Sequence, residues 1–484
     1  MQFIVKLFPE ITIKSVPVRK RLVRQLRDNL RTLLRDLDVP VRVVNDWDKL
    51  DVFVASEVAD VARRVTDILS RTPGIAHFCQ VRSHPLGDME QMLQATLDVW
   101  RHELVGKTFC VRVKRTGQHD FRSIDVERYV GGGLYQQADT AGVRLKDPDV
   151  TVRLEIKRQT LYVIEAQMPG LGGFPLGTQE PVLSLVSGGF DSTVASYLTM
   201  RRGVRTHFCF FNLGGRAHEV GVKEVAYYLW QKYGASHRVM FVSVPFEDVV
   251  QEILTTIENS QMGVVLKRMM LRAAQHIAGE MNMSALVTGE SVAQVSSQTL
   301  TNLSVIDSVS AGLVLRPLIT MDKGEIIGIA RRIGTEEFAA AMPEYCGVIS
   351  RKPTTRAREE RVREEEAKFD FQVLETAIAE RRMVAIDEVV RDLPQLVAAA
   401  PAVEYERQIV IDVRHPDEEE LRPLRLDTHD VLRIPFYRLT AEFEKLDARN
   451  QYLLYCDKGV MSRLHAANLL EAGFANVDVF RLPQ

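Results

Sequence analysis

Cysteine is scarce in this sequence, and its distribution argues against two classes of protein. The 484 residues contain only five cysteines, and no two of them form a CxxC pair. Such wide spacing predicts neither the disulfide framework of a small secreted protein nor a zinc site built from paired thiolates. Each thiol is therefore considered individually: Cys79, Cys110, Cys209, Cys346 and Cys456.

A strong net charge and a long apolar segment are also missing. The formal net charge is −2, so an RNA partner would have to be bound by local basic surfaces rather than by a global field. No stretch approaches the length of a membrane span, and the first ten residues lack a basic segment followed by an apolar core. We expect a cytoplasmic protein with no membrane partner, and the length predicts roughly three domains.

A short apolar run before Ser187 is typical of a buried parallel strand, and it leads into a glycine loop. Gly188 and Gly189 interrupt the run, and a helical pattern continues to Arg202. Glycine lets the backbone come close to a ligand, and the free N–H groups at a helix start favour an anion. Ser187 and Ser192 add hydroxyl groups. The lysine that closes a Walker loop and the three spaced glycines of a dinucleotide fold are both absent.

Strand and helix patterns alternate from 181 to 318, which predicts a doubly wound parallel sheet. In such sheets the ligand lies at the carboxyl ends of the strands. Polar residues follow three of the predicted strands, in the glycine loop, in 212–218 and in 288–298. On the predicted helix 262–281, Lys267 and Arg268 interrupt an apolar face, and the pattern is compatible either with a functional pair or with side chains that only extend to solvent.

Residues 1–170 predict small α+β modules, followed by a linker at 169–177. The first helix is expected from about 18 to 37. On one face it carries Leu22, Leu26, Leu30, Leu33 and Leu37, and within an arc of roughly 80° beside them lie the basic residues Lys20, Arg24, Arg27, Arg31 and Arg35. This basic stripe is either a solvated face or a surface for an RNA backbone. The second module is basic as well, between Lys107 and Arg128.

The C-terminal part predicts a charged helix, a hinge and a further α/β domain. The mixed-charge run 356–371 is interpreted as a solvated helix, and 397–403 as a hinge. Cys456 follows a predicted buried strand and precedes a predicted helix that begins near Ser462. Loop N–H groups and a helix start stabilise a thiolate, so Cys456 is the strongest candidate for a reactive cysteine.

Several motifs together resemble one family, the bacterial tRNA 4-thiouridine synthetases, also known as the ThiI family. The similarity spans essentially the whole chain, with one departure at Ala293, where glycine is expected before Gln294. The matching segments are Ser187-Gly-Gly-Phe-Asp-Ser192, Lys267-Arg268, Thr288-Gly-Glu290, Gln294-Val-Ser-Ser-Gln-Thr299, Arg316-Pro-Leu318 and Pro343-Glu-Tyr-Cys-Gly-Val348.

The resemblance implies a multidomain α/β protein. Its expected parts are a ferredoxin-like domain at 1–60, a THUMP RNA-binding α+β module at 61–168, a doubly wound PP-loop ATP pyrophosphatase domain at 178–372 and a rhodanese α/β domain at 404–484. The implied reaction is ATP-dependent transfer of sulfur from a cysteine persulfide to uridine 8 of tRNA. Adenylation of the uridine O4 precedes the transfer and releases pyrophosphate, and AMP leaves later.

The resemblance also implies partners and residue roles. Mg²⁺ would accompany ATP, with no other metal site, a cysteine desulfurase would supply sulfur, and a ThiS-like sulfur-carrier protein would receive it for the thiamine thiazole. Cys456 would carry the persulfide, Cys346 would be the second thiol, and Asp191 and Lys323 would act in catalysis. Cys79, Cys110 and Cys209 are interpreted as structural. The expected nucleotide-binding residues are Leu185, Val186, Ser187, Gly188, Gly189, Asp191, Ser192, Phe210, Phe211, Lys267, Gly289 and Gln298.

Two rival functions are disfavoured by particular features of the sequence. Another PP-loop enzyme, such as an amidating synthetase or a 2-thiouridylase, would lack the loop around Cys456 or would carry CxxC pairs. A non-enzymatic RNA-binding or sulfur-relay protein would not be expected to keep the intact Ser187–Ser192 loop.

Overall fold

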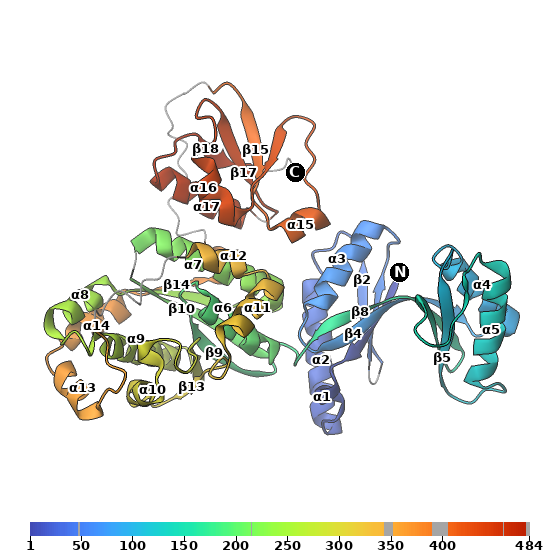
Figure 1. Cartoon of the computed structure of the whole chain (residues 1–484), viewed down its shortest axis with the longest axis horizontal. Coiled ribbons are helices and arrows are strands. Elements are labelled where there is room, and N and C mark those ends of the chain that lie inside the picture. The colour runs from blue at the N-terminus through green and yellow to red at the C-terminus, as the bar shows by residue number, and fades with distance from the viewer. Residues whose placement is uncertain (47–48, 214, 343–351, 390–404, 458, 481–484) are drawn as a thin grey trace. The chain divides into compact units, whose positions relative to one another are not determined.

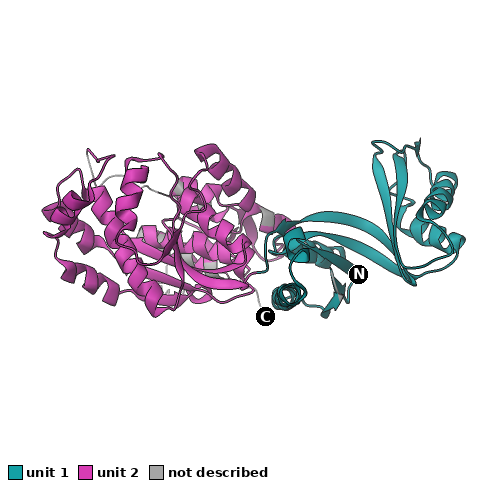
Figure 2. Cartoon of the chain, turned by 90° about the horizontal axis from the view of Figure 1, so that it is seen from below, with its two compact units in different colours: residues 1–175 teal, residues 176–484 magenta. Residues whose placement is uncertain are grey.

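The computed structural model describes residues 1–46, 49–213, 215–342, 352–389, 405–457 and 459–480. The chain divides into two compact units, residues 1–175 and 176–484 (Figure 2). Within the described residues, no helix combines the length and the apolar character needed to cross a membrane.

The first unit is built on one eight-stranded sheet with the order β2-β3-β1-β4-β8-β7-β5-β6. Two apolar cores form on it, one beneath α2 and α3 and the other beneath α4 and α5. The strands are β1 (Gln2–Leu7), β2 (Val41–Asp46), β3 (Lys49–Val54), β4 (Ile75–Pro85), β5 (Thr108–Thr116), β6 (Gly142–Val143), β7 (Val150–Lys157) and β8 (Thr160–Gly172), and the helices are α1 (Pro9–Thr12), α2 (Val16–Leu33), α3 (Ala59–Ser70), α4 (Met89–Trp100) and α5 (Ser123–Gln137).

The predicted linker at 169–177 is partly wrong, because its first four residues belong to β8. Pro169 pairs with His77, and Gly172 pairs with Ile75, in the antiparallel ladder between β4 and β8. A Cβ atom on Gly170 would lie 2.4 Å from the carbonyl oxygen of Ile75. Here glycine permits a close approach of two strands rather than a flexible connection.

The first long helix is α2, and it ends four residues earlier than the leucine pattern predicts. Leu22, Leu26 and Leu30 are buried as predicted, but Leu34, the residue that caps the helix, is buried in place of Leu33. Because the chain turns after Leu33, the regular helical spacing no longer applies to the residues that follow.

The second unit contains a six-stranded sheet with the order β13-β12-β9-β10-β11-β14. Figure 1 labels β9, β10, β13 and β14 of this sheet. Five strands are parallel and only the edge strand β14 is antiparallel, which confirms the predicted doubly wound sheet. The strand order reverses at β9, since β10 and β11 follow on one side and β12 and β13 on the other. The strands are β9 (Gln179–Leu185), β10 (Val204–Asn212), β11 (Met240–Pro245), β12 (Ala285–Val287), β13 (Leu313–Leu315) and β14 (Arg382–Ala385).

Helices pack against this sheet, and the long α9 follows the predicted range closely. The predicted helix 220–233 is instead α7 followed by a turn of π-helix at Trp230–Gly234. The helices are α6 (Phe190–Arg201), α7 (Gly215–Leu229), α8 (Glu247–Thr256), α9 (Met262–Glu280), α10 (Leu300–Asp307), α11 (Lys323–Ile333), α12 (Glu336–Ala341), α13 (Glu359–Glu366) and α14 (Phe371–Ala379).

A third sheet, also within the second unit, has the order β16-β15-β17-β18, and its strands are all parallel. Its elements are β15 (Gln408–Asp412), α15 (Pro416–Leu421), β16 (Asp430–Arg433), α16 (Phe436–Phe443), β17 (Gln451–Tyr455), α17 (Val460–Glu471) and β18 (Val477–Val479). The predicted α/β domain is therefore present. Both the proposed hinge at 397–403 and Cys346 lie outside the described residues.

Candidate functional site

The glycine loop joins β9 to α6 at the point where the strand order of the six-stranded sheet reverses. Open α/β sheets bind ligands at this position, because the loops on the two sides diverge there. The backbone N–H of Ser187 donates to Ser192 Oγ at 3.2 Å, and Thr193 Oγ1 donates to the Gly189 carbonyl at 2.8 Å. These bonds hold the loop at the amino end of α6, where N–H groups favour an anion.

Two glycines are required around this loop, Gly188 by its backbone conformation and Gly289 by close packing against backbone atoms. Gly188 has φ +83°, and a Cβ atom on it would lie 2.5 Å from Met342 Cε. A Cβ atom on Gly289 would lie 2.5 Å from the carbonyl carbon of Asp191 and from the backbone nitrogen of Ser192. The loop after β12 therefore lies directly against the loop after β9, so these two sequence-predicted segments form one site.

Asp191, in the first turn of α6, links the glycine loop to two other segments. Lys323 Nζ donates to Asp191 Oδ1 at 2.9 Å, and Gln294 Nε2 donates to Asp191 Oδ2 at 2.8 Å. Lys323 begins α11, whose N-cap is Asp322. The structure thus brings together Asp191 and Lys323, which are 132 positions apart in the sequence. Gln294 is a partner that the sequence motif contained but whose role we did not predict.

Glu290 is the centre of a buried polar cluster next to this site. Lys267 Nζ donates to its Oε1 at 2.6 Å, and Arg316 Nε donates to its Oε2 at 2.8 Å. Burial alone would raise the pKa of the Glu290 carboxyl, but Lys267 and Arg316 outweigh it and lower the pKa below its ordinary value. Glu290 therefore fixes Lys267 in place, a role that we did not predict.

Lys267 and Arg268 are adjacent in sequence but have different surroundings. Arg268 is 2% exposed and donates to both carboxylate oxygens of Glu366 on α13, at 2.6 and 2.8 Å. It does not extend to solvent, and α13 is not a purely solvated helix. The bidentate pair joins α9 to α13, so Arg268 has a structural role whereas Lys267 belongs to the site.

The predicted nucleotide-lining residues lie around the same strand ends, and all of them except the exposed Ser187 are buried or half-buried. Phe211 packs against Phe246 in the apolar core, with ring centroids 4.7 Å apart. Phe210 contacts the ring of His218, whose Nε2 lies 3.2 Å from the Ser187 carbonyl oxygen. The remaining predicted residues are half-buried or buried beside the loop, and they are Leu185, Val186 and Gln298. Gln298 Oε1 is buried and has no hydrogen-bond partner among the described residues.

Ala293 has an unusual backbone conformation, with φ +65°. This left-handed region favours glycine, which is the residue that the family motif led us to expect there. An alanine in this region costs about 1 kcal/mol, because its Cβ atom crowds the following carbonyl group.

We predict that Ala293→Gly raises the free energy of unfolding of this domain by about 1 kcal/mol. The shift in the denaturation midpoint measures the effect. Ala330→Gly, in the buried interior of the regular helix α11, is the control and should lower stability, because glycine disfavours a helix. A loss of stability in Ala293→Gly would contradict the prediction.

Cys456 lies in a second site, at the loop between β17 and α17. The Ser462 backbone N–H donates to Cys456 Sγ at 3.3 Å. Arg414 forms ion pairs with Asp412 at 2.6 Å and with Asp457 at 2.9 Å. These pairs connect the loop to the end of β15. Asp412 and Arg414 therefore support this loop.

The thiol of Cys456 is buried, and burial opposes the stabilisation of its thiolate that the sequence predicted. Burial raises the pKa of Cys456, whereas hydrogen bonds from Ser462 and from the backbone of Met461 and Gly459 lower it, and the net pKa is above the ordinary value. The N–H groups are present as predicted, but they do not stabilise the thiolate overall. The other described cysteines are buried, and burial raises the pKa of Cys79 to about 11 and that of Cys209 to about 12.

The doubly wound sheet, with its glycine loop at the switch point, defines a nucleotide-binding domain of the PP-loop class. Three family profiles match the chain: the ThiI ferredoxin-like domain at residues 2–79, the THUMP domain at 87–164 and Thiamine biosynthesis protein (ThiI) at 177–371. Proteins named tRNA sulfurtransferase from Azotobacter vinelandii and Pseudomonas putida are 57% and 56% identical to it over 482 residues, 99% of this chain and 100% of each relative. The chain belongs to the tRNA sulfurtransferase family.

Two solved structures share the fold over most of the chain. One is a 4-thiouridine synthetase–RNA complex with bound ATP, with a TM-score of 0.72 and 24% identity, and it covers 79% of this chain and 99% of that chain. The other is PH1313 from Pyrococcus horikoshii, with a TM-score of 0.52 and 18% identity, covering 69% of this chain and 99% of that chain.

Proposed function

We propose that this enzyme uses ATP to replace the O4 oxygen of uridine 8 in tRNA by sulfur, giving 4-thiouridine. The observation that carries the proposal is the Ser187–Ser192 loop at the sheet switch point, bridged by Asp191 to Lys323 at 2.9 Å. Membership of the tRNA sulfurtransferase family supports the same reaction, and relatives in that family carry the name of this activity.

The activation step requires a site that binds phosphates and orients the attack. The uridine O4 attacks the α-phosphorus of ATP, the bond to the β-phosphate oxygen breaks, and pyrophosphate leaves. Backbone N–H groups from Gly188 to Ser192 would bind the phosphates, and Lys323 would stabilise the charge that develops on them. Lys267, held by Glu290, supplies a second cation nearby. Mg²⁺ would accompany ATP, and Asp191 is the carboxylate at the loop that suits it.

The sulfur step requires a carried sulfur atom and two electrons. We propose that 404–484 is a rhodanese domain and that Cys456 accepts sulfur from the persulfide of a cysteine desulfurase. The outer sulfur of the Cys456 persulfide attacks C4 of the activated uridine, and AMP leaves. The thiolate of Cys346 then attacks the Cys456 sulfur, which releases the thiocarbonyl and forms a Cys346–Cys456 disulfide. An external dithiol reduces that disulfide, or a reductant releases the product directly without Cys346.

Nucleoside analysis of tRNA from cells with and without this protein tests the proposed function. We expect 4-thiouridine only where the protein is present, and its restoration when the gene is returned. Equal amounts of 4-thiouridine in both cell lines would contradict the proposal.

A second function is favoured by the family description, Thiamine biosynthesis protein (ThiI), over residues 177–371. We propose that the Cys456 persulfide also donates sulfur to a ThiS-like carrier protein for the thiamine thiazole. Thiamine-dependent growth of cells that contain the Cys456→Ala variant, and thiamine-independent growth of the wild type, would support this role. Thiamine-independent growth of both would contradict it.

The basic stripe on α2 is proposed to bind the RNA backbone, with one refinement from the structure. Asp28 contacts Arg27 at 2.8 Å and Arg31 at 3.9 Å, so these two charges are partly neutralised within the protein. For Arg24, the described residues include no ion-pair partner. Arg24 should therefore contribute more to phosphate binding than Arg27 or Arg31.

We predict that Arg24→Ala weakens tRNA binding and lowers the slope of log affinity against log salt by roughly one unit. Asp28→Asn is the matched control, and it should strengthen binding because it frees two arginines. Filter binding at several salt concentrations measures both effects. An unchanged slope in Arg24→Ala would mean that the stripe is only a solvated helix face.

A further inference from the structure

The C-terminal sheet and the PP-loop domain share one apolar cluster within the second unit. Phe338 of α12 packs between Tyr228 of α7 and Phe436 of α16, with ring centroids at 5.0 and 4.2 Å. Val225 and Tyr228 belong to the same buried cluster as the core of the C-terminal sheet, including Val413. The two parts therefore share buried apolar contacts in this orientation.

A buried polar contact supports the same orientation. His465 Nε2 of α17 lies 3.0 Å from Glu224 Oε1 of α7, without hydrogen-bond geometry, and both side chains are less than a tenth exposed. Such a buried pair adds little net stability, but removal of either partner leaves the other buried without compensation.

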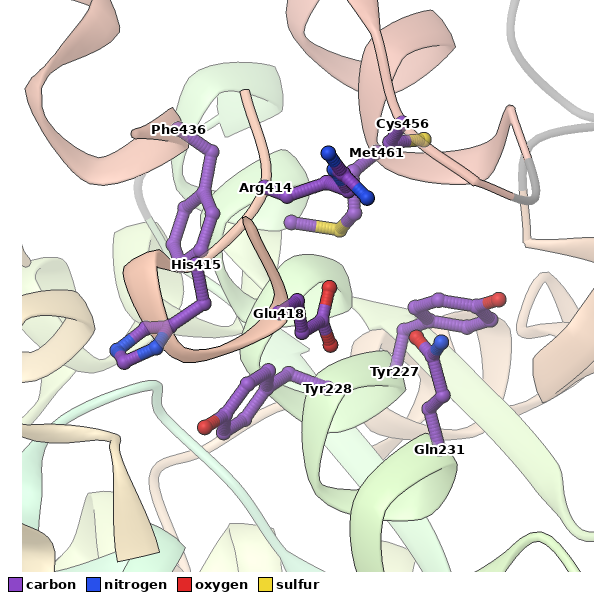
Figure 3. A pocket seen from close by; sticks show the side chains of 9 residues that line it. All are labelled: Tyr227, Tyr228, Gln231, Arg414, His415, Glu418, Phe436, Cys456 and Met461. Atoms are coloured by element: carbon purple, nitrogen blue, oxygen red, sulfur yellow. The ribbon is translucent and has the colours of Figure 1, made fainter. Parts of the chain in front are cut away.

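A small pocket remains where these parts meet, and it contains Cys456. Tyr227 and Gln231 line it from the PP-loop side, and Arg414, Glu418 and Met461 line it from the side of the C-terminal sheet (Figure 3). Its volume is about 20 Å³, which is sufficient for one water-sized group, because about 10–15 Å³ is the minimum for a single water. The outer sulfur of a persulfide is of comparable size. A uracil ring is much larger.

Two polar side chains of the PP-loop domain are available to a group in this pocket. Tyr227 is 2% exposed, and its hydroxyl has no hydrogen-bond partner among the described residues. Gln231 lies in the π-helical turn after α7, and this turn places it beside Tyr227. Such turns interrupt a regular helix and frequently occur at functional sites. A hydroxyl and an amide N–H are both donors, and a persulfide anion is an acceptor.

We propose that this pocket holds the outer sulfur of a Cys456 persulfide, with Tyr227 and Gln231 as its hydrogen-bond donors. The proposal rests on the proposed role of Cys456 as the sulfur carrier. Tyr227 and Gln231 are therefore positioning residues that the PP-loop domain contributes to the cysteine site, and the packed arrangement stores the sulfur.

The same geometry separates storage from transfer. His218, near the start of α7, contacts the nucleotide loop through Ser187. Tyr227 is nine residues further along, and a helix rises 1.5 Å per residue, so it lies about 14 Å along the axis from His218. The pocket cannot admit the uridine, so the C-terminal domain must leave α7 before the sulfur reaches the activated base.

Persulfide lifetime in the full-length protein tests this proposal. A cysteine desulfurase with cysteine transfers sulfur to Cys456. The excess reagents are then removed, and glutathione is added. Its thiolate attacks the outer sulfur, leaving the Cys456 thiolate and glutathione persulfide, and alkylation with mass spectrometry measures the Cys456 persulfide that remains. We expect Tyr227→Phe to lose sulfur about tenfold faster than the wild type, because one donor to a charged group is removed.

Phe338→Glu should increase the rate of sulfur loss more than Tyr227→Phe does, because it disrupts the packing between the two parts. A carboxylate buried among aromatic rings is strongly disfavoured, so this variant should separate the two parts and speed sulfur loss by at least about tenfold. It should also speed alkylation of the unloaded thiol by iodoacetamide, which Tyr227→Phe should change much less. Leu254→Glu, at an exposed position on α8, is the control and should match the wild type in both assays.

Equal persulfide lifetimes in the wild type, Tyr227→Phe and Phe338→Glu would overturn the proposed pocket while leaving Cys456 as the carrier. If Phe338→Glu does not fold, the conservative Tyr227→Phe decides the question alone. Failure of wild-type Cys456 to accept any sulfur would instead overturn the carrier role, and the pocket with it.

Discussion

Cys456→Ala should abolish sulfur transfer to tRNA and leave ATP-dependent activation of the uridine intact. The nucleotide loop belongs to a different sheet from Cys456, so removal of the thiol leaves the Asp191–Lys323 contact unchanged. The measurements are release of pyrophosphate in the presence of tRNA, which should continue, and incorporation of labelled sulfur, which should be undetectable. Normal incorporation of sulfur would remove Cys456 from the mechanism.

Cys346→Ala should behave differently, because the carrier remains. The persulfide still forms and one sulfur can pass to the base, but turnover slows without the thiol that forms the disulfide. Non-reducing peptide mapping after one turnover should detect a Cys346–Cys456 disulfide in the wild type. Cys79→Ala, at a buried strand position, is the control and should turn over normally. No crosslink, together with normal turnover of Cys346→Ala, would leave Cys456 as a simple carrier.

Asp191→Ala should lower the rate of tRNA-dependent pyrophosphate release roughly 100-fold or more, which is typical for loss of a preorganised electrostatic contact at a reacting centre. The carboxylate accepts hydrogen bonds from Lys323 and Gln294, so its removal frees both side chains from their positions. The loop backbone and tRNA binding should be unaffected, because α2 belongs to the other unit.

Asp322→Ala is the matched control for this prediction. Asp322 is an exposed carboxylate that caps α11 and is adjacent to Lys323. Its removal should destabilise the helix start by about 1 kcal/mol, yet leave pyrophosphate release within a few-fold of the wild type. If Asp191→Ala released pyrophosphate at the normal rate, Asp191 would have no role in adenylation.

The parallel sheets and the nucleotide loop could be predicted because their signals are local. An apolar strand, two glycines and a helix start are contiguous before and after Ser187, and parallel strands present their carboxyl ends at one edge. The expectation of glycine at position 293 was also informative, since Ala293 has the backbone conformation that glycine favours.

The wrong predictions share a physical cause, which is that they concerned residues whose partners are distant in the sequence. The segment at Pro169 contains glycine and proline and suggested a linker, but its pairing with His77 makes it a strand. For Arg268 the sequence left open a functional pair or a side chain that extends to solvent, and neither applies, because Glu366, 98 positions away, accepts its hydrogen bonds in the core. A local pattern gives the kind of side chain and does not identify its partner.

The sequence by itself therefore predicted the kinds of residue at the two sites: a glycine loop before a helix, a cation and a carboxylate, and a cysteine just before a helix. Only the tertiary structure decided that Lys267 is held by Glu290, that Asp191 connects α6 to α11, and that burial raises the pKa of Cys456. It alone brings Tyr227 to the same pocket as Cys456. The physical reason is that backbone conformation depends on neighbouring residues, whereas burial, ion pairing and pKa depend on segments that meet only in the folded chain.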